Sequence, residues 1–183
     1  MSDPGAPDLL RFWFEECQPA QWFRKDPAFD QQVRERFGPL SERALAGDLQ
    51  PWADQPGSAL ALVLLLDQLP RQLRRDQPGA FAGDAAALEL SLAALARGWI
   101  EAEAQPSRRQ FWLMPVMHSE DLAIQEQGLK LFERFTDTKT TEFARRHRDV
   151  IARFGRFPHR NEALGRSSSA EELAFLEQPG SRF

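Results

Sequence analysis

The sequence predicts an all-α protein in which about eight helices form antiparallel hairpins around a central buried helix near residues 58–69. This stretch is apolar on every side, and its leucine and alanine content favours a helix over a strand. Other segments repeat apolar residues at intervals of three and four behind capping residues, and none alternates as a strand does. A chain of 183 residues suits one domain, which we expect to span residues 1–183.

Two helices and a loop are expected before the buried helix. A short helix opens at Pro7-Asp8, with the aspartate as its N-cap, and Gln18-Pro19 ends it. A second helix begins at Asp26-Pro27, where an N-cap is followed by proline in the first helical position, and Gly47 ends it. Residues 48–57 contain two prolines and two turn-forming polar residues before a glycine, so we predict a loop there.

The buried helix of residues 58–69 is predicted to end at Pro70, because proline lacks the N–H that would continue the helix. A loop to Gly83 follows. Five further helices are expected, each with a start or stop signal: one capped by Asp84 and ended by Gly98, Pro106–Trp112, Pro115–Phe135, Thr140–Phe154 with Gly155 as its stop, and a last one opened by a capping box at Ser168–Glu171. Short connections between consecutive helices make neighbouring helices antiparallel.

The composition describes a soluble protein. Hydrophobic residues make up 42% and charged residues 27%, and the net charge of −4 argues against general binding to nucleic acid or to acidic membranes. We find no signal peptide and no apolar run of about 18 residues, so we expect a cytoplasmic protein. Cys17 is the only cysteine, which rules out an intrachain disulfide and a thiolate metal cluster.

Positive charge is concentrated toward the C-terminus. Residues 145–166 contain seven arginines and two carboxylates, a net charge of +5, so the remainder of the chain carries −9. Within this segment, residues 153–166 combine four arginines with a histidine, an asparagine and three turn-forming residues. We interpret residues 153–166 as an ordered cationic loop that meets an acidic group. The sequence leaves open whether that group is a ligand or one of the protein's own carboxylates.

Asp67 lies at the predicted end of the buried helix, followed by Gln68. A carboxylate in that place opposes the helix dipole and loses its hydration, so it requires a cationic partner. Arg71 and Arg74 are candidates nearby, and the cationic loop offers others. Such a pair would either hold the core to the loop or allow Asp67 to act as a general base or to orient a catalytic histidine.

A second polar stretch surrounds His118, which precedes a serine and two carboxylates at the predicted start of a helix. Capping explains the serine and the aspartate, but a cationic histidine is disfavoured at that end of a helix. A neutral His118 could act as an acid, a base or a hydrogen-bond donor. Of the other histidines, His159 lies in the cationic loop, and His147 falls on an apolar helical stripe, where we expect a hydrogen-bonded core residue.

These stretches together define a predicted site. We expect His118 or His159 to act as acid or base, oriented by a carboxylate, with arginines that clamp an anionic group. The predicted catalytic residues are His118, His159, Asp67 and Glu120, and the predicted ligand-binding residues are Arg71, Arg156, Arg160, Asn161 and Arg166. We expect neither a metal nor a cofactor, because no pair of ligand-type residues has the spacing of a metal motif and no glycine-rich phosphate loop is present.

Three functions remain open from the residues alone. The first is a pocket that binds, or binds and acts on, a small anionic ligand. The second is a helical module that presents a concave surface to a peptide, with some of the five tryptophans and fourteen phenylalanines as anchors. The third is an internal salt-bridge network with a purely structural role. Whether the protein is an enzyme, and its oligomeric state, also stay open.

Several short stretches form a characteristic series along almost the whole chain. They are Phe12-Trp13-Phe14, Trp22-Phe23, Phe29-Asp30, Leu66 to Arg71, Phe81 with Asp84, Pro115 with Met117 to Glu120, Gln125, His147, Arg153 to Asn161 and Leu164-Gly165-Arg166. In this series the chain resembles the bacterial family of uncharacterised proteins known as domain of unknown function 924, with mild departures at Leu69, Gln72 and Val116. The resemblance implies a fold similar to the tetratricopeptide-like helical superfamily, and it implies no established activity.

Overall fold

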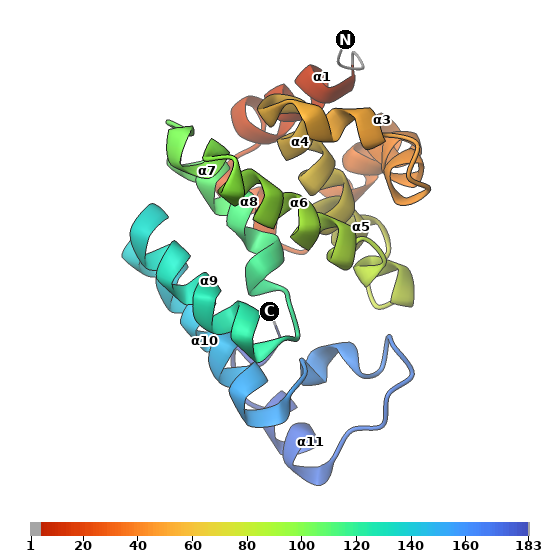
Figure 1. Cartoon of the computed structure of the whole chain (residues 1–183). Helices are drawn as coiled ribbons and strands as arrows, with labels where there is room; N and C mark the ends of the chain where they lie inside the picture. Colours follow the sequence, from red (N-terminus) through yellow and green to blue (C-terminus); the bar gives the residue numbers. More distant parts are fainter. Residues whose placement is uncertain (1–4, 183) are drawn as a thin grey trace.

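The computed structural model describes residues 5–182, and every regular element in that range is a helix (Figure 1). The predicted all-α class is therefore confirmed, and eight of the α-helices in this range have seven or more residues. The α-helices are α1 (Gly5–Arg11), α2 (Pro19–Phe23), α3 (Pro27–Leu45), α4 (Pro56–Val63), α5 (Leu69–Leu73), α6 (Asp84–Ala96), α7 (Trp99–Ala102), α8 (Pro106–Met117), α9 (Leu122–Phe135), α10 (Thr138–Phe154) and α11 (Ala170–Leu176). Between them lie π-helical turns at Phe12–Glu16 and Leu64–Gln68, and 3-10 turns at Gln50–Asp54, Pro78–Phe81 and Pro158–Arg160.

The centre of the protein is one continuous helix composed of α4, the π-helical turn Leu64–Gln68 and α5. All residues from 58 to 70 are buried, as their apolar composition predicted. The predicted stop at Pro70 is wrong, because the helix continues through α5. At the π-helical turn the Leu69 N–H donates to the Leu64 carbonyl, one residue further back than in an α-helix. This wider turn just before the proline relieves the crowding that a proline ring causes in a regular α-helix.

The start of α6 packs against the backbone of this central helix. A side chain at Gly83 would overlap the Leu66 carbonyl oxygen, so the close approach requires glycine. Asp84 is the first residue of α6, but its side chain caps no N–H group, contrary to the prediction. Asp8 was also predicted to cap a helix, but it lies inside α1, where it pairs with Arg11 at 2.6 Å.

The chain between residues 106 and 135 is divided differently from the prediction. A single helix, α8, passes through Pro115 and ends at Met117, and α9 begins only at Leu122. The side chain of Asp121 caps α9 by accepting hydrogen bonds from the N–H groups of its second and third residues. His118 is therefore the C-cap of α8 and not part of a helix start.

Other local signals are confirmed. The side chain of Asp26 accepts from the N–H groups of Ala28 and Phe29 at the start of α3. Gly155 ends α10 in the left-handed conformation, with φ of 69°. The last helix has its capping box at Ser169 and Glu172, one residue later than predicted.

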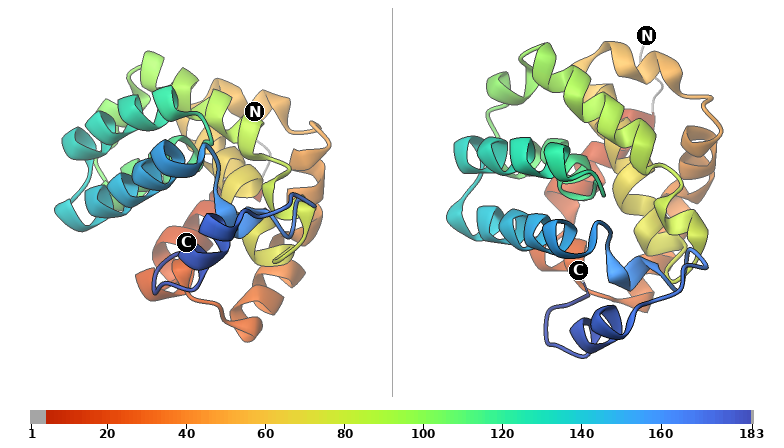
Figure 2. Two further views of the ribbon diagram at one scale, coloured as in Figure 1. Left: turned by 90° about the horizontal axis from the view of Figure 1, so that it is seen from below. Right: turned by 60° about the horizontal axis from the view of Figure 1, so that its bottom comes forward.

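In the last third of the chain, α9 and α10 form an antiparallel hairpin, and α9 packs against α8 (Figure 1). Beyond α10 the chain turns back alongside the connection between α5 and α6 before it reaches α11 (Figure 2). A small hydrophobic cluster, separate from the main core, holds this returning segment: Val150, Ile151 and Phe157 pack with Phe154 and Phe175. The returning segment contains the cationic loop of residues 153–166.

One stretch, Pro78–Ala96, is long and apolar enough to cross a membrane by length and composition alone. It combines a 3-10 turn with α6, and 28% of its apolar 18-residue portion is buried inside the protein. Because α6 packs against α4 and α8, and because a helix that covers a protein core meets the same criterion, the stretch does not by itself indicate a membrane.

Candidate functional site

Asp67 and His118 form a buried pair between the central helix and the end of α8. Asp67 lies within the π-helical turn and is fully buried, and its Oδ1 is 2.7 Å from Nδ1 of His118. The neighbouring Gln68 amide donates a hydrogen bond to the other carboxylate oxygen. The two residues are 51 positions apart in the sequence, and packing of α8 against the central helix brings them together.

The charges of this pair follow from its surroundings. Burial alone would raise the pKa of Asp67, but the interaction with His118, the charge of Arg71 and the hydrogen bond from Gln68 lower it well below its usual range. Burial, and next the positive charge of Arg71, lower the pKa of His118 despite the nearby carboxylate. At neutral pH we therefore assign an ionised Asp67 and a neutral His118, whose Nδ1–H donates to the carboxylate.

This tautomer leaves Nε2 of His118 as a proton acceptor. No residue in the range 5–182 hydrogen-bonds to Nε2, and this nitrogen is not among the polar atoms sealed from solvent without a partner. The side chain of His118 keeps 10% of its surface exposed. The arrangement is that of a histidine base held in one orientation by a carboxylate.

Arg71 connects the pair to α6. Its guanidinium binds both carboxylate oxygens of Asp84, at 2.7 and 2.9 Å, and donates to the backbone carbonyl of Asp67 at 2.7 Å. The same guanidinium is 3.4 Å from the Asp67 carboxylate. Asp84 thus has two roles that explain why it caps no helix N–H: it binds Arg71 and also an arginine of the cationic loop.

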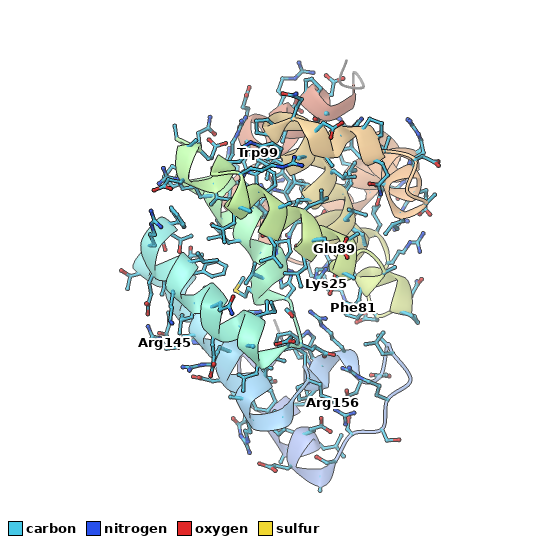
Figure 3. All side chains as sticks on the ribbon, in the orientation of Figure 1. Lys25, Phe81, Glu89, Trp99, Arg145 and Arg156 are labelled. Atoms are coloured by element: carbon cyan, nitrogen blue, oxygen red, sulfur yellow. The ribbon has the colours of Figure 1, made fainter. Side chains whose placement is uncertain are left out.

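That second arginine is Arg160. It donates to Asp84 at 3.1 Å and to the backbone carbonyl of His118 at 2.9 Å. Its guanidinium also lies 4.7 Å from the ring centre of Phe81 and 4.6 Å from that of Phe157. Phe81 lies on the side of the N-terminal half of the protein that faces the segment with Arg156 (Figure 3). The cationic loop is therefore fastened to the region of the Asp67–His118 pair.

Glu120 fixes the middle of the loop. Its carboxylate accepts two hydrogen bonds from Arg166, at 2.7 and 3.0 Å, and one from the Phe157 N–H at 2.7 Å. Burial would raise the pKa of Glu120, but these hydrogen bonds lower it. Arg166 also donates to the side-chain oxygen of Asn161, which is almost fully buried. Glu120 therefore contacts the loop, Asn161 is bonded within it, and neither has a hydrogen bond to His118.

The remaining arginines of the loop pair with α11. Arg156 binds both carboxylate oxygens of the buried Glu172, at 2.7 and 2.8 Å, and this hydrogen bonding lowers the pKa of Glu172 to about 2. Arg153 binds Glu171 at 2.6 Å. All four arginines of residues 153–166 therefore have a carboxylate partner within the protein.

The other two histidines are buried and neutral. Burial lowers the pKa of His147 to about 3, and its Nδ1 is 2.7 Å from the Phe143 carbonyl, as expected for a core histidine. Burial and the charge of Arg160 lower the pKa of His159 to about 3. His159 borders a surface hollow of about 420 Å³ whose lining also includes Glu162, Arg166, Ser168 and Arg182. His118 does not line this hollow.

The structure thus brings Asp67, His118, Arg71 and Arg160 into one connected network and places Glu120 and Arg166 beside it. Arg156 and His159 lie elsewhere on the loop. Sequence reasoning missed Asp84 as a site residue, although it was noted as a cap, and it missed Gln68 and Glu172 as partners. In residues 5–182 no three histidine, cysteine or acidic side chains converge to hold a metal ion.

Comparisons with known proteins agree with this fold. A family model described as "bacterial protein of unknown function (DUF924)" matches residues 9–180. A solved structure, titled as the protein of unknown function ATU0120 from Agrobacterium tumefaciens, is similar over 94% of this chain and 96% of that one, with a TM-score of 0.88 and 37% sequence identity. No curated protein matches the chain. None of these findings names an activity or a tetratricopeptide repeat.

Proposed function

The chain belongs to the bacterial family of unknown function DUF924, and we propose that it uses His118 as an acid–base residue, oriented by Asp67, to act on a small molecule. The observation that carries this proposal is the 2.7 Å contact between the two side chains, which leaves Nε2 of His118 without a hydrogen bond to any residue from 5 to 182. A neutral imidazole with a buried, ionised carboxylate behind it accepts a proton readily, because the carboxylate stabilises the imidazolium that forms.

The arginines support this centre and do not act as free anion clamps. Arg71 and Arg160 share Asp84, Arg166 is bound to Glu120, and Arg156 to Glu172. Near His118, the positive charges of Arg71, Arg160 and Arg166 are thus balanced by the carboxylates of Asp67, Asp84 and Glu120. Because no net positive charge is left over there, the predicted clamping of an anion by these arginines has less support than the predicted role of His118.

Nuclear magnetic resonance of the imidazole nitrogens tests the centre without knowledge of the substrate. At pH 7 we expect His118 to be neutral with the proton on Nδ1, and we expect Asp67→Asn to change this tautomer. His147, whose Nδ1 faces a backbone carbonyl, is the control whose tautomer should stay the same. A His118 that is cationic, or that carries its proton on Nε2, would contradict the proposal.

Turnover of chromogenic esters and phosphate esters provides a second test. If His118 transfers a proton in the reaction, His118→Gln should lower the rate by roughly 100-fold or more, while His159→Gln changes it little. Circular dichroism of each variant shows whether it is folded. A folded His118→Gln protein with full activity would remove His118 from the mechanism.

The hollow beside His159 supports a second candidate function, the binding of a small anion. Its lining contains Arg166, Arg182 and Ser168, all of which donate hydrogen bonds. Thermal unfolding with phosphate, sulfate or small carboxylates tests this function. If the hollow binds an anion, at least one of these ligands should raise the melting temperature, and His159→Ala should abolish the increase. Without such an increase, the hollow would have no role in binding these anions.

A further inference from the structure

Arg108, at the start of α8, differs from the arginines of the cationic loop. No residue in the range 5–182 forms an ion pair or a hydrogen bond with it, although the side chain is only partly exposed and its Nε is buried. Its guanidinium lies 5.2 Å from the ring centre of Phe14. Removing a charged donor from water without an acceptor is costly, so the position favours an anionic acceptor.

The surroundings of Arg108 are aromatic. Phe111 is fully buried and is contacted by four rings whose centres lie within 6.1 Å: Trp13, Phe14 and Trp22 edge-on, and Phe23 nearly parallel at 12°. Phe23 is 59% exposed, which is unusual for a ring of this size, so the cluster reaches the surface of the protein. A flat apolar ligand could stack against such a cluster.

Two further buried polar atoms beside this cluster have no partner among residues 5–182. They are Nε1 of Trp13, whose ring packs edge-on against Phe111 at 5.6 Å, and Oε1 of Gln72, whose amide nitrogen contacts the Trp22 carbonyl. Trp13 is fully buried and Gln72 is 5% exposed. Buried polar groups in proteins nearly always have a partner, so unpartnered groups around one aromatic cluster indicate that a polar molecule belongs there.

We propose that Arg108 and the aromatic cluster of Phe14, Trp22, Phe23 and Phe111 bind a small aromatic carboxylate. The guanidinium supplies the charge and the planar donor geometry that a carboxylate prefers, and the rings supply stacking surface. Buried water can satisfy the amide oxygen of Gln72 and the indole N–H of Trp13, but it leaves the Arg108 charge without a counterion.

This site is separate from the acid–base centre. Phe111 and His118 are seven residues apart, on the same side of α8, which corresponds to about 10 Å along the helix. The binding proposal does not depend on the chemistry of His118, and an inactive His118→Gln protein should still bind the ligand.

Binding of benzoate and phenylacetate to the full chain tests the proposal. Tryptophan fluorescence and isothermal titration calorimetry report binding, and benzyl alcohol and acetate serve as probes that lack the charge or the ring. We expect the two aromatic carboxylates to bind more tightly than either control probe. Absence of measurable binding at concentrations up to about 10 mM, or equal binding of benzyl alcohol, would overturn the proposal.

Variants distinguish Arg108 from a general charge effect. Arg108→Gln should weaken benzoate binding by about tenfold or more, because a charge-assisted contact is lost. Arg109→Gln is the matched control, since the neighbouring guanidinium is already bonded to the Glu103 backbone carbonyl. Phe23→Ala, at an exposed position, tests the stacking surface with little risk to folding. Unchanged affinity in folded Arg108→Gln protein would refute the assignment.

Discussion

Replacing Asp84 by asparagine is expected to lower the free energy of unfolding by about 3 kcal/mol. The carboxylate accepts three hydrogen bonds from two arginines, and the side chains of Arg71 and Arg160 are only 20% and 7% exposed. Breaking one partner of a buried ion pair costs about 3–5 kcal/mol, and the 21% exposure of Asp84 places the effect at the lower end of this range. For a chain of this length the melting temperature should fall by roughly 6–12 °C.

Urea unfolding followed by circular dichroism measures this effect. If the slope of the unfolding free energy against urea concentration is unchanged, only the stability has changed. Glu101→Gln is the control, because Glu101 and its partner Arg134 are 64% and 61% exposed and such a pair contributes about 1 kcal/mol or less. The double variant Asp84→Asn with Arg160→Gln should lose less than the sum of the two single variants, since the buried charge of Arg160 is then no longer left without its partner Asp84. A loss below about 1 kcal/mol for Asp84→Asn would refute the view that Asp84 holds the network together.

Three further predictions concern the backbone, the histidines and the loop. Gly83→Ala should cost about 2 kcal/mol or more in unfolding free energy, because its side chain would overlap a carbonyl of the central helix, whereas Gly57→Ala, which meets no neighbour, should cost little or stabilise. Burial lowers the pKa of all three histidines, so below their ordinary value near 6.5 the unfolded chain binds more protons than the folded one. The unfolding free energy should therefore fall as the pH is lowered from 6.5 to 5, by up to about 1.4 kcal/mol per pH unit for each histidine. Folded His147→Gln should reduce that slope by roughly one third, and an unchanged slope would show that His147 does not contribute. Glu120→Gln should speed amide hydrogen exchange at Phe157 and in the loop around it, since the Phe157 N–H loses a charged acceptor, and exchange as slow as in the wild type would contradict this role of Glu120.

The paired arginines change the interpretation of the cationic loop. With four arginines and one carboxylate, residues 153–166 resemble a ligand site in the sequence, yet in the folded chain these arginines bind Asp84, Glu120, Glu171 and Glu172. Such pairs orient the loop and fix its register, while their net contribution to stability is small because each charge loses its hydration. The group that we propose for chemistry is the neutral imidazole of His118, and the arginine that we propose for binding a carboxylate is Arg108, outside the loop.

Two proline signals in the sequence were misleading for a common reason. Pro70 and Pro115 were both taken as helix boundaries, but both lie inside helices. A proline removes only one backbone hydrogen bond and crowds one turn, a cost of about 3 kcal/mol that burial of a long apolar helix can exceed. The misplaced boundaries moved His118 from the end of α8 to the start of another helix and Asp67 from a helix interior to a helix end.

The sequence by itself determined the all-α class, the buried central helix and several helix ends, such as Asp26 and Gly155. These features depend on residues within a few positions of each other, so composition, spacing and capping preferences report them directly. It also identified the residue types that form the site. Only the tertiary structure decided which charges meet, because Asp67 and His118 are 51 residues apart and Arg160 and Asp84 are 76 residues apart. Such contacts depend on how whole helices pack, and a carboxylate can pair equally well with any arginine until that packing selects one.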